Sequence, residues 1–343
     1  MTLLTFPRSL PVGIFTVIAA TAFIAGTSVP ASAQPSAPLH STADNVEIIL
    51  DHAETMELPT ALSTAAEPAE SILADAVISN VLNERDTELS TLAAQERDVR
   101  VDIREASDST AFGVAIVTAP MGADEDPQAW LFAAEHDSSG WDVGLEGTEE
   151  FSSLLADSSL LDEEERESIA ASTDPAQAAP ANYTGLGLPF AIGTSMVMTG
   201  GPHGDIGESL DFAGGEGLAR ASRGGYAYSL CDGWTRVIHD NGYSTDYYHL
   251  EDYQWLPGND VEVGHYLGSQ GNSLCAGGST TGAHIHYSLR GYTDPNAAGW
   301  YLTMNGKTLG GWTFVQGSQY DGYAYRDGVG TVYPGGLVHN YGF

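Results

Sequence analysis

The spacing of apolar residues differs between the two halves of this chain. It predicts a mixture of helices and strands in the first half and mainly strands in the second. In the first half, apolar residues recur at helical spacing over 70–83, which predicts a helix. Alternation of apolar and polar residues then predicts strands, and acidic residues open a second helical pattern. The strands are expected at 99–104, 112–118, 130–134 and 141–145, the last two as a hairpin about 137–140, and short helices at 149–155 and 162–170. This mixture predicts a small α+β domain.

In the second half, alternation dominates and no helical period persists. Asn241 and Gly242 together are a strong hairpin turn signal between two alternating segments. Strands are expected at 226–230, 235–238, 244–248, 261–267 and 283–289. This pattern predicts a mainly β domain, built as an antiparallel sheet with long loops.

The N-terminus has the features of a secretory signal peptide. Arg8 is the positive start, 13–26 is an apolar run short for a bilayer span, and 31–33 is a small-residue cleavage site. Residues 1–33 are therefore expected to be a signal peptide, and the mature product is expected to be secreted.

A stretch rich in alanine and proline separates the two halves. Residues 171–182 have the composition of an exposed linker that proteases reach, so a maturation cut is expected there. Accordingly, 34–178 is expected to be an acidic α+β prodomain with its linker, and 179–343 the second domain.

Composition and charge divide the chain in the same way. All sixteen tyrosines fall at or after Tyr183, and residues 1–180 carry 26 of the 34 net negative charges. Strong acidity argues against nucleic acid and against electrostatic binding to membranes, because both are polyanions. The simpler interpretation of the acidic half is a solvated face that keeps the protein in solution. The alternative is that this half covers a site in the second half until it is removed.

The two cysteines, Cys231 and Cys275, both lie in the second half. An even count in an exported chain indicates one disulfide. Closing a loop of this length stabilises a fold by about 4 kcal/mol on the chain-entropy model.

Four histidines and one aspartate are the candidate metal ligands: His203, Asp211, His249, His284 and His286. If 284–286 lies in a strand, its period of two sends both imidazoles to one face. Each residue taken alone is more often structural. Their convergence within 84 residues, each beside strand-like sequence, favours a zinc site with three protein ligands and one open position.

These segments resemble the lysostaphin-type zinc metalloendopeptidases, close to their staphylolytic and β-lytic branch. The resemblance rests on His203 followed by Asp211, on Tyr-Tyr-His-Leu at 247–250, and on Ser-Thr-Thr-Gly-Ala-His-Ile-His-Tyr-Ser-Leu at 279–289. The segment 261–268 is similar to a strand and turn of the same family. The likeness covers about residues 185–340, while the first half resembles the family's propeptides only loosely.

The resemblance implies a role for each of the five residues. It makes His203, Asp211 and His286 the ligands of one zinc ion, and it places His249 and His284 beside the metal as catalytic residues. Many family members separate the first histidine and the aspartate by three residues, whereas seven lie between them here. N–H groups of His249 and His284 would then stabilise an oxyanion or move protons.

The resemblance also bears on the remaining candidates. Cys231 and Cys275 fall where that branch places a disulfide. Tyr247, Tyr248 and Tyr287 are candidates to line a substrate groove, although such residues more often pack a β core.

The function that this implies is a secreted zinc endopeptidase made as a proenzyme. Its substrates would be glycine-containing peptide bonds in peptidoglycan cross-bridges or Gly-rich proteins, and its own prodomain would be an intramolecular inhibitor. Three alternatives stay open: a non-catalytic wall-binding or regulatory module of the same fold, a zinc D,D-peptidase, and a metal-binding protein without turnover.

Overall fold

The computed structural model describes residues 46–49, 69–173, 182–292 and 300–343. These described residues belong to one compact unit. The predicted signal peptide and the predicted boundary at 178/179 lie outside the described residues, so both stay predictions. In the part of the chain that is described, no helix has the length and apolar character needed to cross a membrane.

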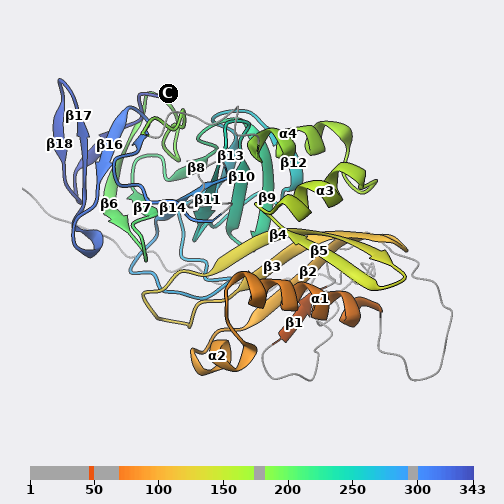
Figure 1. Ribbon diagram of the computed structural model, residues 1–343. Coiled ribbons are helices and arrows are strands. Elements are labelled where there is room, and N and C mark those ends of the chain that lie inside the picture. Colours follow the sequence, from red (N-terminus) through yellow and green to blue (C-terminus); the bar gives the residue numbers. More distant parts are fainter. Residues whose placement is uncertain (1–45, 50–68, 174–181, 293–299) are drawn as a thin grey trace, which may run out of the picture. The chain divides into compact units, whose positions relative to one another are not determined.

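The first half folds around a five-stranded sheet with the strand order β1-β2-β3-β4-β5 (Figure 1). β1 pairs parallel to β2, and the other pairs are antiparallel. The strands are β1 (Val46–Ile49), β2 (Val99–Ala106), β3 (Thr110–Val117), β4 (Gln128–Asp137) and β5 (Gly140–Leu145), and the helices are α1 (Ala69–Glu84), α2 (Leu89–Ala94), α3 (Glu149–Asp157) and α4 (Glu163–Thr173). The predicted α+β character of this half is confirmed.

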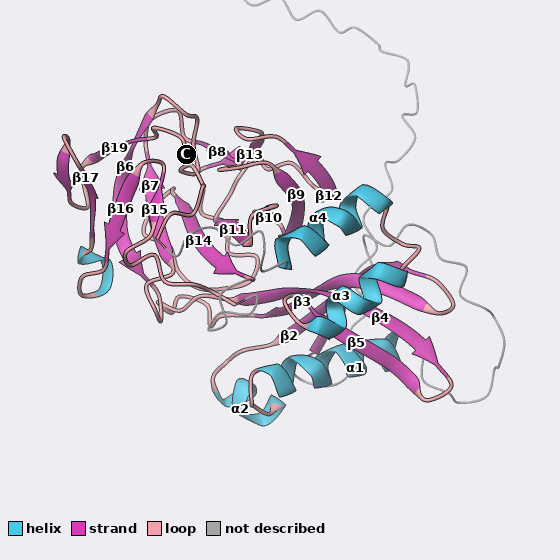
Figure 2. Ribbon diagram, turned by 45° about the horizontal axis from the view of Figure 1, so that its top comes forward, coloured by secondary structure: helices cyan, strands magenta, loops and turns pink. Residues whose placement is uncertain are grey.

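Alternation along the strands gives this sheet two apolar faces. On β4, Trp130 and Phe132 pack with α1, whereas Leu131 packs with α3. Figures 1 and 2 show α1 on one side of the sheet and α3 on the other. Thr148 caps α3 by accepting a hydrogen bond from the Phe151 amide at 3.1 Å, which sets where that helix begins. Both faces of the sheet are therefore covered by apolar packing.

The second half folds around an eight-stranded antiparallel sheet, in the order β12-β9-β10-β11-β14-β7-β6-β19. Its strands are β6 (Ser195–His203), β7 (Ser209–Ala213), β9 (Gly225–Cys231), β10 (Trp234–Ile238), β11 (Tyr243–Tyr248), β12 (Pro257–Val261), β14 (Ile285–Gly291) and β19 (Leu337–His339). Between residues 182 and 343, the only described helical segment is the 3-10 turn η2 (Gln319–Asp321). The predicted mainly β, antiparallel fold is confirmed.

Two small sheets complete this half. One pairs β8 (Leu218–Arg220) with β13 (Tyr266–Ser269), and the other contains β15 (Thr308–Leu309), β16 (Trp312–Val315), β17 (Tyr323–Arg326) and β18 (Gly330–Val332). The single strand predicted over 261–267 is wrong. A turn with Gly264 at φ 82° follows the end of β12 at Val261, and the chain restarts in β13 of a different sheet.

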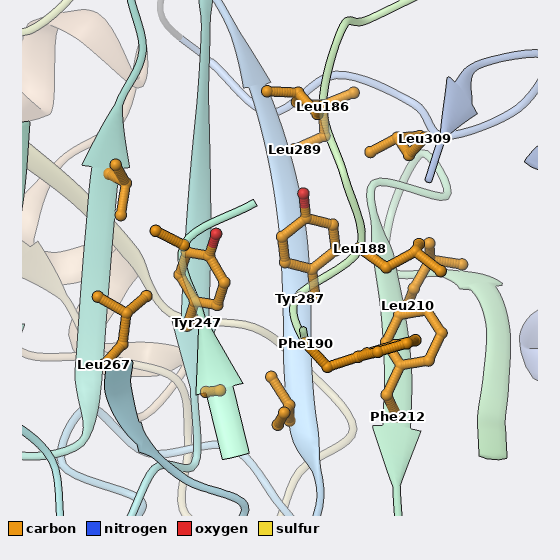
Figure 3. Packing of buried hydrophobic residues seen from close by; sticks show 14 of the residues in the cluster. Leu186, Leu188, Phe190, Leu210, Phe212, Tyr247, Leu267, Tyr287, Leu289 and Leu309 are labelled. Carbon is orange, nitrogen blue, oxygen red and sulfur yellow. The ribbon is translucent and has the colours of Figure 1, made fainter. Parts of the chain in front are cut away.

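One face of the eight-stranded sheet, called the apolar face here, packs within the second half of the chain. The opposite face, called the polar face here because it carries the candidate ligands and buried charges, also packs Tyr226, Trp234 and Tyr248 against apolar residues of the first half. On the apolar face, Tyr247 of β11 and Tyr287 of β14 lie side by side in the core with Phe212 of β7 (Figure 3). On β14, His286 and Arg290 point to the opposite face, as the period of two requires. The residues that carry chemistry are thereby separated from the core along a single strand.

The predicted disulfide is present. Cys231 at the end of β9 is bonded to Cys275, with the two Cα atoms 6.0 Å apart. Cys275 belongs to the long loop that leads into β14. The bond thus anchors to the sheet the same loop that carries His284.

Candidate metal centre

Three adjacent strands bring the predicted ligands together. Asp211 of β7 and His286 of β14 are direct cross-strand partners on the polar face. His203 is the last residue of β6, and residues 204–208 form the turn into β7, so one hairpin spans the separation between His203 and Asp211. A register shift between Gly200 and His203 puts an extra residue into β6. Such bulges re-aim side chains, and this one turns His203 toward Asp211.

Gly200 is required where β6 passes Asp211. A Cβ atom at this position would lie 2.8 Å from Asp211 Oδ2. Glycine therefore lets the carboxylate lie directly against the neighbouring strand.

The three candidate ligand atoms form a nearly equilateral triangle. His286 Nδ1 lies 3.1 Å from Asp211 Oδ1 and 3.4 Å from His203 Nε2, and the remaining side, from His203 Nε2 to Asp211 Oδ1, is 3.5 Å. Tetrahedral zinc with bonds of about 2.0–2.1 Å needs ligand atoms about 3.3–3.4 Å apart. Two imidazole nitrogens and one carboxylate oxygen are also a donor set that zinc accepts. The residues present therefore fit a zinc ion.

The second nitrogen of each ligand histidine has its own partner. His203 Nδ1 lies 2.8 Å from the carbonyl oxygen of Gly201, which leaves Nε2 for the metal. His286 uses the opposite nitrogen: Nδ1 faces the triangle, and Nε2 lies 3.5 Å from Asp126 Oδ2. Outer partners of this kind set the tautomer and the ring orientation of a metal-binding histidine.

The two predicted catalytic histidines flank the triangle. His249 follows β11 directly with φ 66°, a left-handed conformation that is uncommon outside glycine and occurs at functional sites. His284 precedes β14, so the expectation that both residues of the His-Ile-His segment lie in a strand is wrong for His284. Its ring nevertheless faces the site, with Nε2 3.4 Å from Asp211 Oδ1. The ring centroids of His249 and His284 are 4.7 Å apart.

Backbone carbonyls orient both of these rings. His249 Nδ1 lies 2.8 Å from the Ser273 oxygen, and His284 Nδ1 lies 2.7 Å from the Gly282 oxygen. Each Nδ1 must carry a hydrogen to donate these bonds, so each neutral ring has its lone pair on Nε2.

Burial and mutual charge set the protonation of the site. Burial lowers the pKa of His249 to about 3, so its ring is neutral at physiological pH. Burial would raise the pKa of Asp211, but the imidazole of His203 and those of His284 and His286 outweigh it and hold that pKa well below the usual value. Asp211 is therefore a candidate oxygen ligand that is anionic throughout the physiological range.

His249, His284 and His286 form a second set of potential ligands, with one nitrogen from each within 4.8 Å of the others. This set shares His286 with the triangle. The described residues thus place all five predicted residues in one cluster, with the Asp211 carboxylate on one side and the imidazoles of His249 and His284 on the other.

A cleft of ≈ 640 Å³ opens over this cluster. Its walls include His249, His284 and Tyr248 from the second half, and Asp126 from the first half. Of the three tyrosines predicted to line a substrate groove, only Tyr248 is among the described residues that line this cleft, and its contact with substrate stays a prediction. The structure corrects the groove prediction for the other two tyrosines, because residues 247 and 287 are fully buried on the apolar face of the sheet.

Two site residues were not found from the sequence. Tyr320 packs its ring on His203 with the centroids 4.3 Å apart, and Asp126 contacts His286 from the first half of the chain. Neither belongs to a motif. Only the tertiary contacts bring them to the metal centre.

Comparison with known proteins finds similar sequences among metalloendopeptidases. A β-lytic metalloendopeptidase from Lysobacter enzymogenes is 32% identical over 156 residues, which is 40% of this chain and 83% of the relative. One from Achromobacter lyticus is 30% identical over 166 residues, 43% of this chain and 42% of the relative. This chain thus matches less than half the length of the Achromobacter protein. A scan against models of protein families finds no match.

Among solved structures, the M23 metalloprotease pseudoalterin from the deep sea is similar. It is 27% identical over 45% of this chain and 97% of the other, with a TM-score of 0.40.

The β sheet and its His-Asp-His triangle define a metalloendopeptidase of the lysostaphin type. Within that class, the chain belongs to the β-lytic metalloendopeptidase family.

Proposed function

We propose that this protein is a zinc endopeptidase that uses a zinc-bound water to hydrolyse peptide bonds. The observation that carries the proposal is the triangle of His203 Nε2, Asp211 Oδ1 and His286 Nδ1, with sides of 3.1–3.5 Å at the base of an open cleft. Zinc held there supplies a Lewis acid for the scissile carbonyl and lowers the pKa of its water to about 7.

The two flanking histidines move the protons. Because Nδ1 of His249 and of His284 donates to a backbone carbonyl, each Nε2 is an acceptor when the ring is neutral. A neutral imidazole takes a proton from the attacking water, and the resulting imidazolium then donates to the oxyanion or to the leaving amine. The N–H groups that were expected to stabilise an oxyanion or move protons would then form at Nε2, once it has accepted a proton.

The cleft favours substrates with small residues. One wall is the continuous segment 278–283, Gly-Ser-Thr-Thr-Gly-Ala, with no large side chain. Glycine-containing peptides, as in peptidoglycan cross-bridges or Gly-rich proteins, suit such a wall. Of the net charge of −34, 26 charges belong to residues 1–180, so the trimmed chain keeps about −8. This charge mildly disfavours binding to an anionic wall polymer, so the peptide itself would supply the binding contacts.

We further propose that the protein is secreted as a proenzyme, with residues 1–33 as signal peptide and the acidic first half as inhibitor. This proposal is supported by the position of residues 123–126, which line the same cleft as the site histidines. Cutting the predicted linker at 171–182 would allow the first half, and with it residues 123–126, to dissociate from the cleft.

One experiment tests the activity. The purified protein, before and after limited proteolysis of the linker, is incubated with pentaglycine-bridged wall and with a Gly-rich protein, and the products are analysed by mass spectrometry. We expect new termini at glycine only after trimming, their loss with a chelator, and their return with added zinc. Equal hydrolysis by the uncut and trimmed proteins would contradict the inhibitory role alone. No hydrolysis in any zinc-loaded sample would contradict the peptidase assignment.

A further inference from the structure

Residues 119–126, between β3 and β4, are described here as the strap. The strap begins by following the disulfide loop of the second half. The Ala119 amide donates to the Ala276 carbonyl, and the Gly122 amide donates to the Gly278 carbonyl, both at 2.8 Å. Met121 and Gly278 form a parallel bridge. This is the pairing by which an extended peptide adds to an exposed backbone edge.

The strap then contacts the opposite wall of the cleft. Asp124 accepts a hydrogen bond of 2.6 Å from the hydroxyl of Tyr320, the residue whose ring packs on His203. Asp126 Oδ2 lies 3.5 Å from His286 Nε2. The segment therefore touches both walls of the cleft and approaches two of the three candidate ligands from outside the triangle.

We propose that the strap is a clamp on the metal centre, in which Asp126 is a positioning residue that orients His286 and strengthens metal binding in the uncut chain. The proposal rests on the proposed zinc site. It adds that the first half of the chain, besides covering the cleft, holds one ligand of the second half.

The chemistry of the two imidazole nitrogens supports this role. When Nδ1 of His286 binds a metal through its lone pair, Nε2 must carry the hydrogen and needs an acceptor. Asp126 supplies a carboxylate at that nitrogen, which fixes the tautomer and raises the basicity of the ligand nitrogen. Loss of such an outer partner costs about 10–100-fold in metal affinity. Cutting the chain and releasing the strap would therefore loosen the metal as well as open the cleft.

The test measures zinc dissociation constants of the uncut, full-length chain by competition with a chromogenic chelator. Asp126→Ala is expected to weaken zinc binding about 10–100-fold. Asp126→Asn is expected to lose less, because its amide oxygen still accepts the His286 N–H. Glu125→Gln is the matched control: it removes the neighbouring charge, but that carboxylate is bound to Arg97 at 2.5 Å. We expect the control to bind zinc within about twofold of the unmodified chain, because an ion pair of this kind, with Glu125 exposed, has little effect at a distance.

Two outcomes overturn the clamp. One is zinc binding by Asp126→Ala within about twofold of the unmodified chain; the other is an equal loss in Glu125→Gln, which would mean a general charge effect. Thermal unfolding with chelator present verifies that each variant folds, and Asp126→Asn keeps the side-chain shape if the alanine variant does not fold. Because zinc affinity is measured without a substrate, failure of the clamp is distinguishable from failure of the peptidase assignment.

Discussion

The two faces of the eight-stranded sheet differ in where their partners come from. On the apolar face, Tyr287 and its neighbours pack in a cluster whose described members all belong to the second half. On the polar face, Arg236 of β10 forms an ion pair with Glu146 of the first half at 2.5 Å and a second one with Asp246 of β11 at 2.7 Å. Arg290 donates to the Ala129 carbonyl at 2.9 Å, and His286 meets Asp126.

This difference shows which properties can depend on the first half of the chain. Removing that half takes no member from the described apolar cluster inside the second half, but it removes the first-half partners of Tyr226, Trp234 and Tyr248 on the opposite face. On the polar face it exposes the metal centre and removes the outer partners of buried charges. The core therefore accounts for the fold of the second half, while the polar face is where we expect maturation to act.

The largest expected effect comes from comparing two neighbouring residues of β14 that point to opposite faces of the sheet. His286→Ala removes a proposed ligand, and we expect stoichiometric zinc to be lost and kcat/KM of the trimmed enzyme to fall by at least about 10³-fold, roughly 4 kcal/mol. Tyr287→Phe removes only a 3.0 Å hydrogen bond to Ser222 in the core. It should lower the free energy of unfolding by about 1 kcal/mol and leave zinc content unchanged. Metal analysis and kinetics of both variants measure this contrast, and loss of zinc in the phenylalanine variant would contradict it.

A smaller effect separates metal binding from proton transfer. His249→Ala removes a neutral imidazole that lies outside the triangle, so kcat should fall about 10²–10⁴-fold while zinc content stays at one per chain. His265→Ala is the control, because the His265 ring bonds Gln254 at an exposed position and its loss should change neither quantity. Equal losses of zinc and turnover in His249→Ala would assign His249 to the metal instead.

The next effect concerns the buried charges of the polar face. Glu146→Ala leaves Arg236, which is fully buried, with one carboxylate instead of two. We expect the uncut chain to lose about 3–5 kcal/mol of unfolding free energy, because a buried ion pair is broken and the buried Leu131 amide loses the carboxylate that accepts its hydrogen bond. Glu135→Ala, at an exposed position of the first half, should change it by less than about 0.5 kcal/mol. Denaturant unfolding measures both free energies. Similar losses in the two variants would show that the Glu146–Arg236 ion pair does not stabilise the fold.

The smallest expected effect is a pH dependence of the contact between α4 and β9. Burial raises the pKa of Glu165 to about 7, and its carboxyl accepts a hydrogen bond from the Tyr228 hydroxyl at 2.5 Å. A carboxyl whose folded pKa exceeds its unfolded value near 4.5 stabilises the fold fully below that lower value. The contribution is lost as pH rises toward 7, up to about 3 kcal/mol.

We therefore expect the uncut chain to lose stability between about pH 4.5 and pH 7, measured by denaturant unfolding across that range. Glu165→Gln cannot ionise, and this part of the pH dependence should be absent from it. An unchanged pH profile in the glutamine variant would exclude Glu165 as the group responsible.

Local sequence predicted α1, α3, α4 and the strands β2–β5, β9–β11 and β14, but it did not predict α2, β1, β6–β8 or β15–β19. Period-two alternation predicted β14, and the Asn-Gly turn predicted the hairpin of β10 and β11, because each is a property of neighbouring residues. The strand predicted over 261–267 failed because a local apolar pattern does not show that the chain changes sheets there. Likewise, alternation predicted the burial of one face of a strand but not which tyrosines would face the core.

The sequence also identified the candidate ligands, since imidazole and carboxylate groups beside strands limit the possible chemistry to a few residues. It could not show that Asp126, which lies in the first half of the chain, reaches His286, because that contact depends on how two sheets pack. The bulge in β6, the left-handed turn at His249 and the strap are likewise consequences of tertiary packing. The types of residue in the sequence therefore indicated which chemistry is possible. The distances between those residues depend on long-range contacts, which a local sequence pattern does not contain.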